Sequence, residues 1–243
     1  MVRYREYEIT FFPPLTPMVR LLLVVTGAAF VLTYFPLKIA GWRLPFELFG
    51  LTPYAVTHAL YVWQPVTYLF LHAGFFHIIF NLYVLWVFGP DVESAWGGKQ
   101  FLFYYFLTGV GAGIVDVMMG PSSLTMTIGC SGALFGLMLA YGVLFPNRII
   151  YYLIIPMKAK WFVVIMGVIE FVDLLGAHNS GVSYIAHLSG LLIGYLYLRG
   201  PGLSPRLRLR YGDWRRAKLR KQFEVYMRDQ NEKKKKGPDR WIN

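Results

Sequence analysis

A serine at the start of an apolar stretch is the first group in this sequence that could do chemistry. Ser131 stands in TMTIGCSGALFGLMLAYGVLF, most of which reads as a membrane-spanning helix. Two other apolar stretches carry side chains that are costly inside a bilayer and are by default functional candidates. One is LFLHAGFFHIIFNLYVLWVFG, with His72, His77 and Asn81, and the other is SYIAHLSGLLIGYLYL, with His187. A hydroxyl, an imidazole and N–H donors are the parts of an acyl-transfer site.

Glycine pairs predict how the serine and the last histidine meet. Small residues four apart let two helix backbones approach closely. Ser131 directly precedes one such pair and His187 precedes another by three residues; the pairs are Gly132 with Gly136 and Gly190 with Gly194. Close packing of these two helices would bring the hydroxyl within hydrogen-bond reach of the imidazole, as an activated nucleophile with its base.

Oxyanion donors are expected from two sources. Free backbone N–H groups at the start of the serine helix are one source. The other is His77 and Asn81, which are four residues apart and share one helix face. At 1.5 Å per residue, these two lie about 12 and 18 Å into a helix that starts at residue 69. Ser131 and His187 lie about 5 and 9 Å into theirs, so all four belong to the outer half of the membrane.

Each of these residues alone has an ordinary structural explanation. A serine in a membrane helix usually bonds to the preceding turn, and a lone His187 is explained as an interhelical hydrogen-bond partner. Cys130 is expected to be a small packing residue. Three acidic residues near outer helix ends are expected to be solvated or interfacial rather than a third member of a catalytic group: Asp116, Glu170 and Asp173. The coincidence of the four polar residues favours a site.

The elements that must position these residues are membrane helices. The chain has 243 residues, of which 56% are hydrophobic and 15% are charged, too few charges for a soluble domain of this length. Its apolar blocks approach or exceed the length of about 20 residues that crosses a bilayer. The sequence therefore predicts an all-α, polytopic membrane protein with six transmembrane helices, at about 18–35, 69–89, 100–119, 128–145, 157–175 and 181–199.

Charge sets the orientation. Residues 200–243 hold 14 Lys and Arg against 5 Asp and Glu, a net +9 of the chain's +11. With six spans both termini lie on one side, and that side also carries most of the other basic residues, which predicts that both ends are cytoplasmic. Residues 1–17 are then a cytoplasmic N-terminal segment and 200–243 a basic cytoplasmic tail near anionic headgroups. A basic tail could also bind nucleic acid, but the sequence has no nucleic-acid-binding pattern that supports this partner.

Two connections are too apolar to be solvated. The first loop, 36–68, is rich in aromatic and aliphatic residues, so we expect it to lie in the outer membrane interface. The stretch IIYYLIIP, 149–156, is expected to be a similar interfacial piece on the cytoplasmic side. The single cysteine excludes an internal disulfide and a cysteine-built metal site, and the expected chemistry uses no metal or cofactor.

The polar residues fall in three spaced motifs: Gly129-x-Ser131-Gly132 with Phe135 and Gly136, Ala186-His187-x-x-Gly190-x-x-x-Gly194, and His72-x-x-x-x-His77-x-x-x-Asn81. Together these motifs resemble the rhomboid family of intramembrane serine proteases over roughly 18–199. The six-helix layout and the large interfacial first loop match as well. Two departures concern the first loop, where only Trp42-Arg43 approaches the family's Trp-Arg pair, and Cys130, where the family often has alanine or another small or apolar residue.

The resemblance implies a Ser131–His187 dyad without an acid. It further implies an oxyanion hole made by His77, Asn81 and the Ser131 N–H, and it brings in His72 and Gly132 as supporting residues. Gly129 would shape the loop beneath the hole, and Phe135 would stack on the dyad histidine. Substrates would be transmembrane segments of membrane proteins, cut near their outer end. The chain would be a rhomboid of the simple six-helix prokaryotic type, located in the cell (inner) membrane.

Two other functions stay open at this point. A non-catalytic rhomboid-like protein would bind transmembrane helices for quality control or trafficking with the same fold; the presence of both Ser131 and His187 argues against it. A transporter would be expected to have charged residues at mid-membrane and internal repeats, and the sequence has neither.

Overall fold

The computed structural model describes residues 14–152, 155–176, 183–200, 216, 219–220, 223–228 and 230–231. Most of the expected N-terminal segment and most of the basic tail lie outside the described residues.

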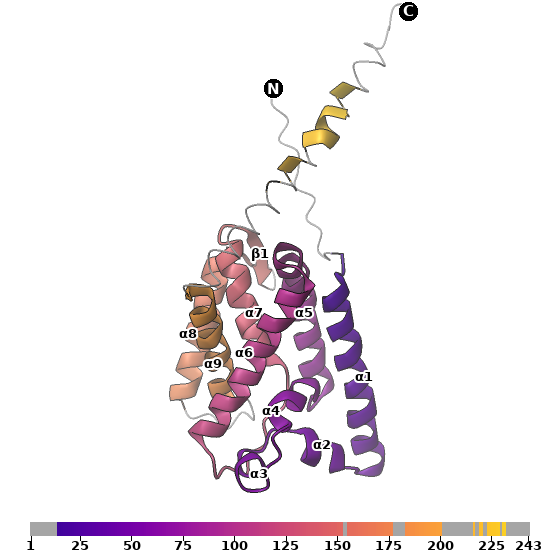
Figure 1. The fold of residues 1–243 in the computed structure, drawn as a ribbon, viewed down its shortest axis with the longest axis vertical. Helices are drawn as coiled ribbons and strands as arrows, with labels where there is room; N and C mark the ends of the chain where they lie inside the picture. The colour runs from indigo at the N-terminus through magenta and orange to yellow at the C-terminus, as the bar shows by residue number, and fades with distance from the viewer. Residues whose placement is uncertain are drawn as a thin grey trace, which may run out of the picture.

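Six helices of 14 residues or more, among the described residues, correspond one to one with the six predicted spans (Figure 1). By length and composition three of them, α1, α5 and α6, are long and apolar enough to cross a membrane. The protein is therefore a polytopic helical membrane protein. The six are α1 (Pro17–Ala40), α5 (Phe75–Trp96), α6 (Gly98–Met119), α7 (Ser131–Leu144), α8 (Ala159–Leu175) and α9 (Tyr184–Arg199).

Three helix boundaries differ from the prediction by five residues or more. One is the end of α5, predicted at residue 89, which continues through Pro90 to Trp96. The first helix continues through Pro36 to Ala40, and Gly41, with a φ of +65°, forms a left-handed cap after it. The second predicted span began at residue 69, but α5 begins at Phe75, after the short 3₁₀ helix η1 (Tyr68–Phe70) and the extended Gly74. Hydropathy cannot separate 69–74 from the helix, because these residues are also apolar and buried in part.

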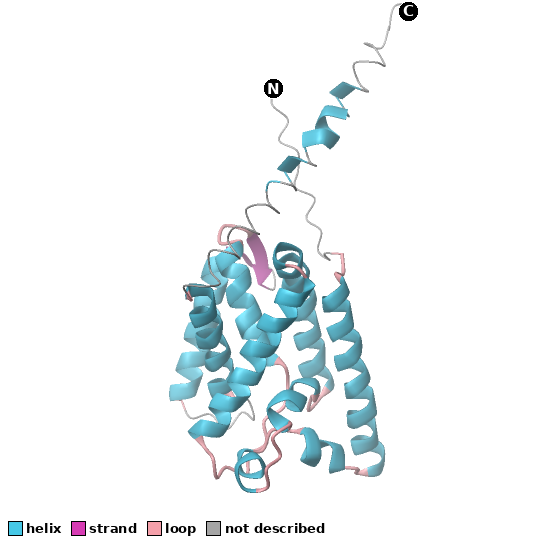
Figure 2. Ribbon diagram, viewed as in Figure 1, coloured by secondary structure: helices cyan, strands magenta, loops and turns pink. Residues whose placement is uncertain are grey.

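The first loop folds into three short helices, α2 (Leu44–Phe49), α3 (Pro53–His58) and α4 (Gln64–Thr67) (Figure 2). Each has proline in its first turn, where the missing N–H does no harm. Gln64 is fully buried and ties the loop together: its Oε1 accepts from the Thr52 N–H at 2.9 Å and its Nε2 donates to the Glu47 carbonyl at 3.1 Å. Large apolar side chains stay exposed on the loop, as an interfacial position requires; they include Trp42, Leu60 and Val62.

A β-hairpin is the exception to the all-α prediction. Strands β1 (Ile149–Tyr152) and β2 (Ile155–Lys158) pair antiparallel in the connection between α7 and α8, with Ile149 opposite Lys158 (Figure 2). The hairpin covers the stretch 149–156, and Ile149 and Ile155 are exposed, which fits the interfacial position predicted for it.

Helix α7 is the centre of the bundle, and glycines set its neighbours. A methyl group added to Gly190 of α9 would lie 2.0 Å from the Gly132 carbonyl oxygen, so the two backbones touch. The second glycine of each pair faces α6 instead: Gly136 lies against Thr108 and Gly194 against Tyr104. The predicted packing of α7 on α9 is thus confirmed, but one glycine from each helix makes it.

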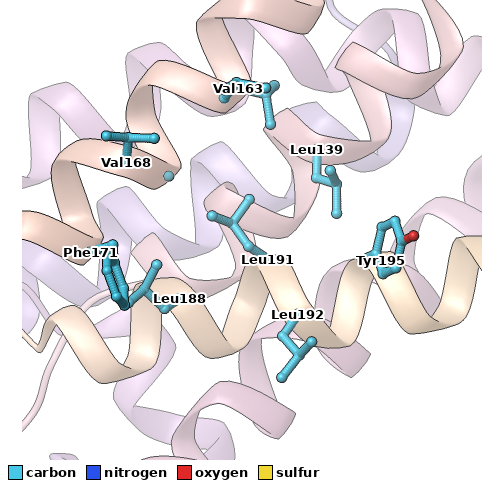
Figure 3. Close-up of a pocket in the computed structure, with 10 residues that line it drawn as sticks. Leu139, Val163, Val168, Phe171, Leu188, Leu191, Leu192 and Tyr195 are labelled. Carbon is cyan, nitrogen blue, oxygen red and sulfur yellow. The ribbon is translucent and has the colours of Figure 1, made fainter.

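An apolar groove of about 420 Å³ lies between α7, α8 and α9 (Figure 3). It contains none of the polar candidate residues. Its lining includes Leu139 from α7, Val163, Val168 and Phe171 from α8, and Leu188, Leu191 and Tyr195 from α9.

Candidate active site

The structure brings Ser131 and His187 together. Ser131 is the first residue of α7 and His187 is the fourth residue of α9. The Ser131 Oγ lies 2.5 Å from the His187 Nε2, a distance at which the hydroxyl donates to the ring nitrogen. The contact follows from the close approach of Gly132, the residue after Ser131, and Gly190, three residues after His187.

An aromatic ring covers the imidazole. Phe135, one turn after Ser131, stacks on the His187 ring with centroids 4.5 Å apart and planes at 20°. His187 is 8% exposed and Phe135 is 6% exposed. The stack leaves the ring little freedom to turn, so its two nitrogens keep their partners.

The second ring nitrogen of His187 has an acidic partner. The Nδ1 lies 2.8 Å from Oε2 of Glu170, on α8, and Glu170 is 8% exposed. The expectation that Glu170 is solvated or interfacial is therefore wrong. An ionisable residue in a spanning helix is a functional candidate. Glu170 was not predicted as one because it lies near the outer end of the predicted span 157–175.

The other two acidic residues stay outside the Ser131–His187 contact. Asp116 is half-buried and accepts hydrogen bonds from the Thr127 and Ser183 hydroxyls, both at 2.8 Å. It links the end of α6 to the segments that precede α7 and α9. Asp173 is also half-buried, three residues beyond Glu170.

Gly129 lies directly against His77 and Asn81. A methyl group added to its Cα would lie 2.8 Å from the His77 Nε2 and 3.6 Å from the Asn81 Nδ2. Its φ of +114° is also one that side-chain-bearing residues rarely adopt. Glycine at this position therefore lets the two polar groups come within a few ångströms of the chain two residues before Ser131.

The Asn81 amide nitrogen is buried and has no hydrogen-bond partner among the described residues. Asn81 is only 3% exposed, and a buried donor without a partner costs about 1–3 kcal/mol. Such a group is explained where it awaits an acceptor that the resting protein does not contain. His77 and the first N–H groups of α7 are further donors beside it.

The first loop holds this segment in place. Leu51 and Thr127 exchange backbone hydrogen bonds of 3.0 and 2.8 Å, and the Gly129 N–H donates to the Tyr68 carbonyl at 2.9 Å. The loop thereby fixes the segment that leads into Ser131.

His72 lies behind the site and does not contact Ser131. It is fully buried, with its Nε2 3.8 Å from the Cys130 Sγ and its ring 4.9 Å from that of His77. Cys130 is fully buried as well, as its predicted packing role requires. His72 thus contacts both Cys130, on the segment before Ser131, and the His77 ring.

The polar residues lie at similar depths below the helix starts. With α5 beginning at Phe75, His77 and Asn81 lie about 3 and 9 Å into it, and His187 lies about 4 to 5 Å into α9. Glu170 lies about 7 to 8 Å before the end of α8. The earlier depths of about 12 and 18 Å were too large because they counted residues that precede α5. The same comparison applied to the fifth span would have indicated Glu170.

The arrangement is suited to acyl transfer rather than metal chemistry. It combines a hydroxyl on an imidazole with the unpaired amide donor of Asn81. Within the part of the chain that the structure describes, no group of three His, Cys, Asp or Glu side chains is arranged to hold a metal ion.

Comparisons with known proteins agree on one family. A model of the rhomboid domain matches residues 59–200, more than half of the chain and all of the site residues above. YdcA, a rhomboid protein of Bacillus subtilis, is 33% identical over 136 residues, which cover 55% of this chain and 64% of that protein. Rhomboid-like protein 11, a chloroplast protein of Arabidopsis thaliana, is 34% identical over 159 residues, 61% of this chain and 56% of that protein.

A relative named as a protease is also similar. The rhomboid protease GlpG of Yersinia pestis is 29% identical over 144 residues, which cover 59% of this chain and 50% of that protein. The chain spans less than two thirds of the length of each of these relatives.

Proposed function

The chain belongs to the rhomboid family, and on that premise we propose that it is an intramembrane serine endopeptidase. The 2.5 Å contact between the Ser131 Oγ and the His187 Nε2 carries the proposal. A half-buried serine hydroxyl on a buried imidazole needs a reason to exist inside a membrane protein, and a nucleophile with its base is the chemistry that this pair can perform.

The reaction is an acyl transfer to serine followed by hydrolysis. The Ser131 Oγ attacks the peptide carbonyl carbon while His187 Nε2 takes the hydroxyl proton. The imidazolium then gives that proton to the leaving amine, and an acyl-enzyme forms. Water, deprotonated by His187, hydrolyses the ester and returns Ser131 to its starting state.

N–H donors near Ser131 take the developing negative charge. We assign the oxyanion hole to the His77 ring N–H, the Asn81 amide and the Ser131 backbone N–H. The unpartnered Asn81 Nδ2 supports this assignment, since the tetrahedral oxyanion is the acceptor that it lacks. Gly129 provides the space, and Phe135 holds the base.

The substrates would be transmembrane segments of other membrane proteins. The site lies at the outer end of the bundle, where α8 ends and where α5, α7 and α9 begin. Cleavage is therefore expected near the outer end of a substrate helix. Water must reach Ser131 from that side for the second half-reaction.

We further propose that the bundle spans the inner membrane of a prokaryotic cell and that its hairpin end faces the cytoplasm. Helix α1 begins and α9 ends at that end (Figure 1). More basic residues lie there than at the other end, which is the pattern of a cytoplasmic side: the hairpin end has Lys99, Arg148, Lys158 and Lys160, and the other end has Lys38 and Arg43. The basic residues after 200 would then contact anionic headgroups on the cytoplasmic face.

The test is cleavage of a single-span substrate by the purified full chain in detergent and in proteoliposomes, alongside Ser131→Ala and His187→Ala. We expect fragments from the unmodified protein alone, and labelling of Ser131 by a fluorophosphonate in that protein alone. Equal fragments from Ser131→Ala would identify a contaminating protease or a different nucleophile.

A helix-binding protein without catalysis is the competing outcome. No cleavage of several substrates, together with no fluorophosphonate labelling of the unmodified protein, would overturn the protease and favour that function.

A further inference from the structure

Glu170 is a carboxylate buried in the outer half of a membrane helix. All residues of α8 are described, and the buried ones are Ala159, Phe162 and Val163 near its start and Glu170 alone near its end. Most side chains that follow Glu170 in the helix are exposed, among them Phe171, Val172 and Leu175. A buried carboxylate destabilises the folded protein unless a hydrogen-bonded or oppositely charged partner offsets its desolvation.

The partner is the base of the proposed reaction. Glu170 Oε2 lies 2.8 Å from His187 Nδ1, and the two side chains are equally shielded, each 10% exposed. The opposite ring nitrogen, Nε2, contacts the Ser131 Oγ at 2.5 Å. Serine, imidazole and carboxylate therefore form one hydrogen-bonded chain across α7, α9 and α8.

The chemistry of each group fixes the direction of this chain. An ionised carboxylate only accepts hydrogen bonds, so the Nδ1 of His187 must carry the proton and donate it to Glu170. In a neutral imidazole the other nitrogen, Nε2, then has a free lone pair. That lone pair faces the serine hydroxyl, which is the tautomer that a general base for Ser131 requires.

We propose that Glu170 is a positioning residue that completes a Ser131–His187–Glu170 triad, in place of the two-residue dyad that the sequence implied. The proposal rests on the proposed protease function. Glu170 takes no proton during the reaction: the Ser131 proton moves to Nε2, the Nδ1 proton stays in place, and the carboxylate stabilises the resulting imidazolium until Nε2 protonates the leaving amine.

A purely structural role is the competing explanation. Glu170 is the buried contact of the outer half of α8, so it also holds that helix against α9. An anchor and a triad member respond differently to conservative changes. An anchor is preserved best by equal size, whereas the triad is preserved best by the charge and the acceptor.

The experiment therefore compares Glu170→Gln with Glu170→Asp in the full chain in proteoliposomes. Glutamine keeps the size but can turn its NH₂ group to Nδ1, which places the proton on Nε2 and removes the base. We expect Glu170→Gln to lower kcat by up to about 10⁴-fold, the loss that the corresponding change causes in a Ser-His-Asp enzyme, with KM unchanged. Glu170→Asp, shorter but charged, should retain more kcat than Glu170→Gln.

Two further measurements make the result specific. Fluorophosphonate labelling of Ser131 should slow in Glu170→Gln in parallel with kcat, because both reactions need the base. Asp173→Asn is the matched control: it removes the half-buried carboxylate one turn further along the same helix and should leave kcat and labelling unchanged.

The reverse order of activity, with Glu170→Gln equal to the unmodified protein or above Glu170→Asp, would reduce Glu170 to an anchor and overturn the triad. Unmodified protein that neither cleaves nor labels would instead overturn the proposed function, and the triad with it. The labelling of the unmodified protein thus separates the two failures.

Discussion

The backbones of Gly190 and Gly132 are in direct contact. A methyl group on Gly190 would lie 2.0 Å from the Gly132 carbonyl oxygen, which is backbone and cannot turn aside. This contact sets the separation of α7 and α9, and His187 and Ser131 lie on these helices within three residues of it. The geometry of the site therefore depends on the absence of a side-chain carbon at both Gly132 and Gly190.

Gly190→Ala is expected to separate α7 from α9. Overpacking of this kind costs about 1–3 kcal/mol, and a displacement of about 1 Å at the site would lower turnover by about 10²-fold. Thermal unfolding and cleavage of a single-span substrate measure the two effects.

Gly167→Ala is the matched control on α8. Its added methyl group would meet Leu191 Cδ1 at 3.4 Å, an ordinary contact, so stability and activity should stay close to those of the unmodified protein. Activity lost equally in both variants would argue against the α7–α9 contact as the cause.

Gly129→Ala is expected to damage the oxyanion hole. The new methyl group would meet the His77 ring at 2.8 Å, and the φ of +114° is unfavourable for alanine. Displacing one donor should lower kcat by about 10²- to 10³-fold. Gly27→Ala, in α1 with open space around its Cα, should leave cleavage unchanged and raise stability slightly. Full activity of Gly129→Ala would show that the hole lies elsewhere.

Asn81→Ala is expected to separate activity from stability. The Nδ2 donates no hydrogen bond in the resting protein, so its removal leaves no acceptor unpaired. As an oxyanion donor, however, it should contribute about 10²-fold or more to kcat. Activity assays and unfolding midpoints on the same preparation check both statements. Unchanged turnover would remove Asn81 from the site, and a smaller loss would indicate that His77 shares the charge.

Phe135→Leu is expected to loosen the His187 ring. Aromatic stacking contributes about 0.5–1.5 kcal/mol beyond burial, so kcat should fall by about threefold to tenfold if the stack orients the base. Phe88→Leu removes a comparable stack with Phe162, whose ring centroid lies 5.7 Å away, far from the site residues. That control should lose stability and keep kcat; an equal loss of kcat in both variants would contradict an orienting role for Phe135.

Much of the fold could be predicted because its signals are local. Apolar length locates six helices, although three of their ends differ from the prediction by five to seven residues: the end of α1 and both ends of α5. The hairpin at 149–158 could not be predicted in this way, since its apolar residues suit an interfacial helix as well as a strand. Gln64 likewise gives no periodic signal, although its side chain holds the first loop together.

The sequence by itself determined which groups could react and how deep they lie, because hydropathy and the rise per residue are properties of each segment alone. It therefore brought Ser131, His187, His77 and Asn81 to one level of the membrane. Only the tertiary structure decided which of them touch, and it added Glu170. The partner of a side chain depends on the rotation of each helix about its axis. That rotation is set by contacts such as Gly190 on Gly132, which no single helix encodes.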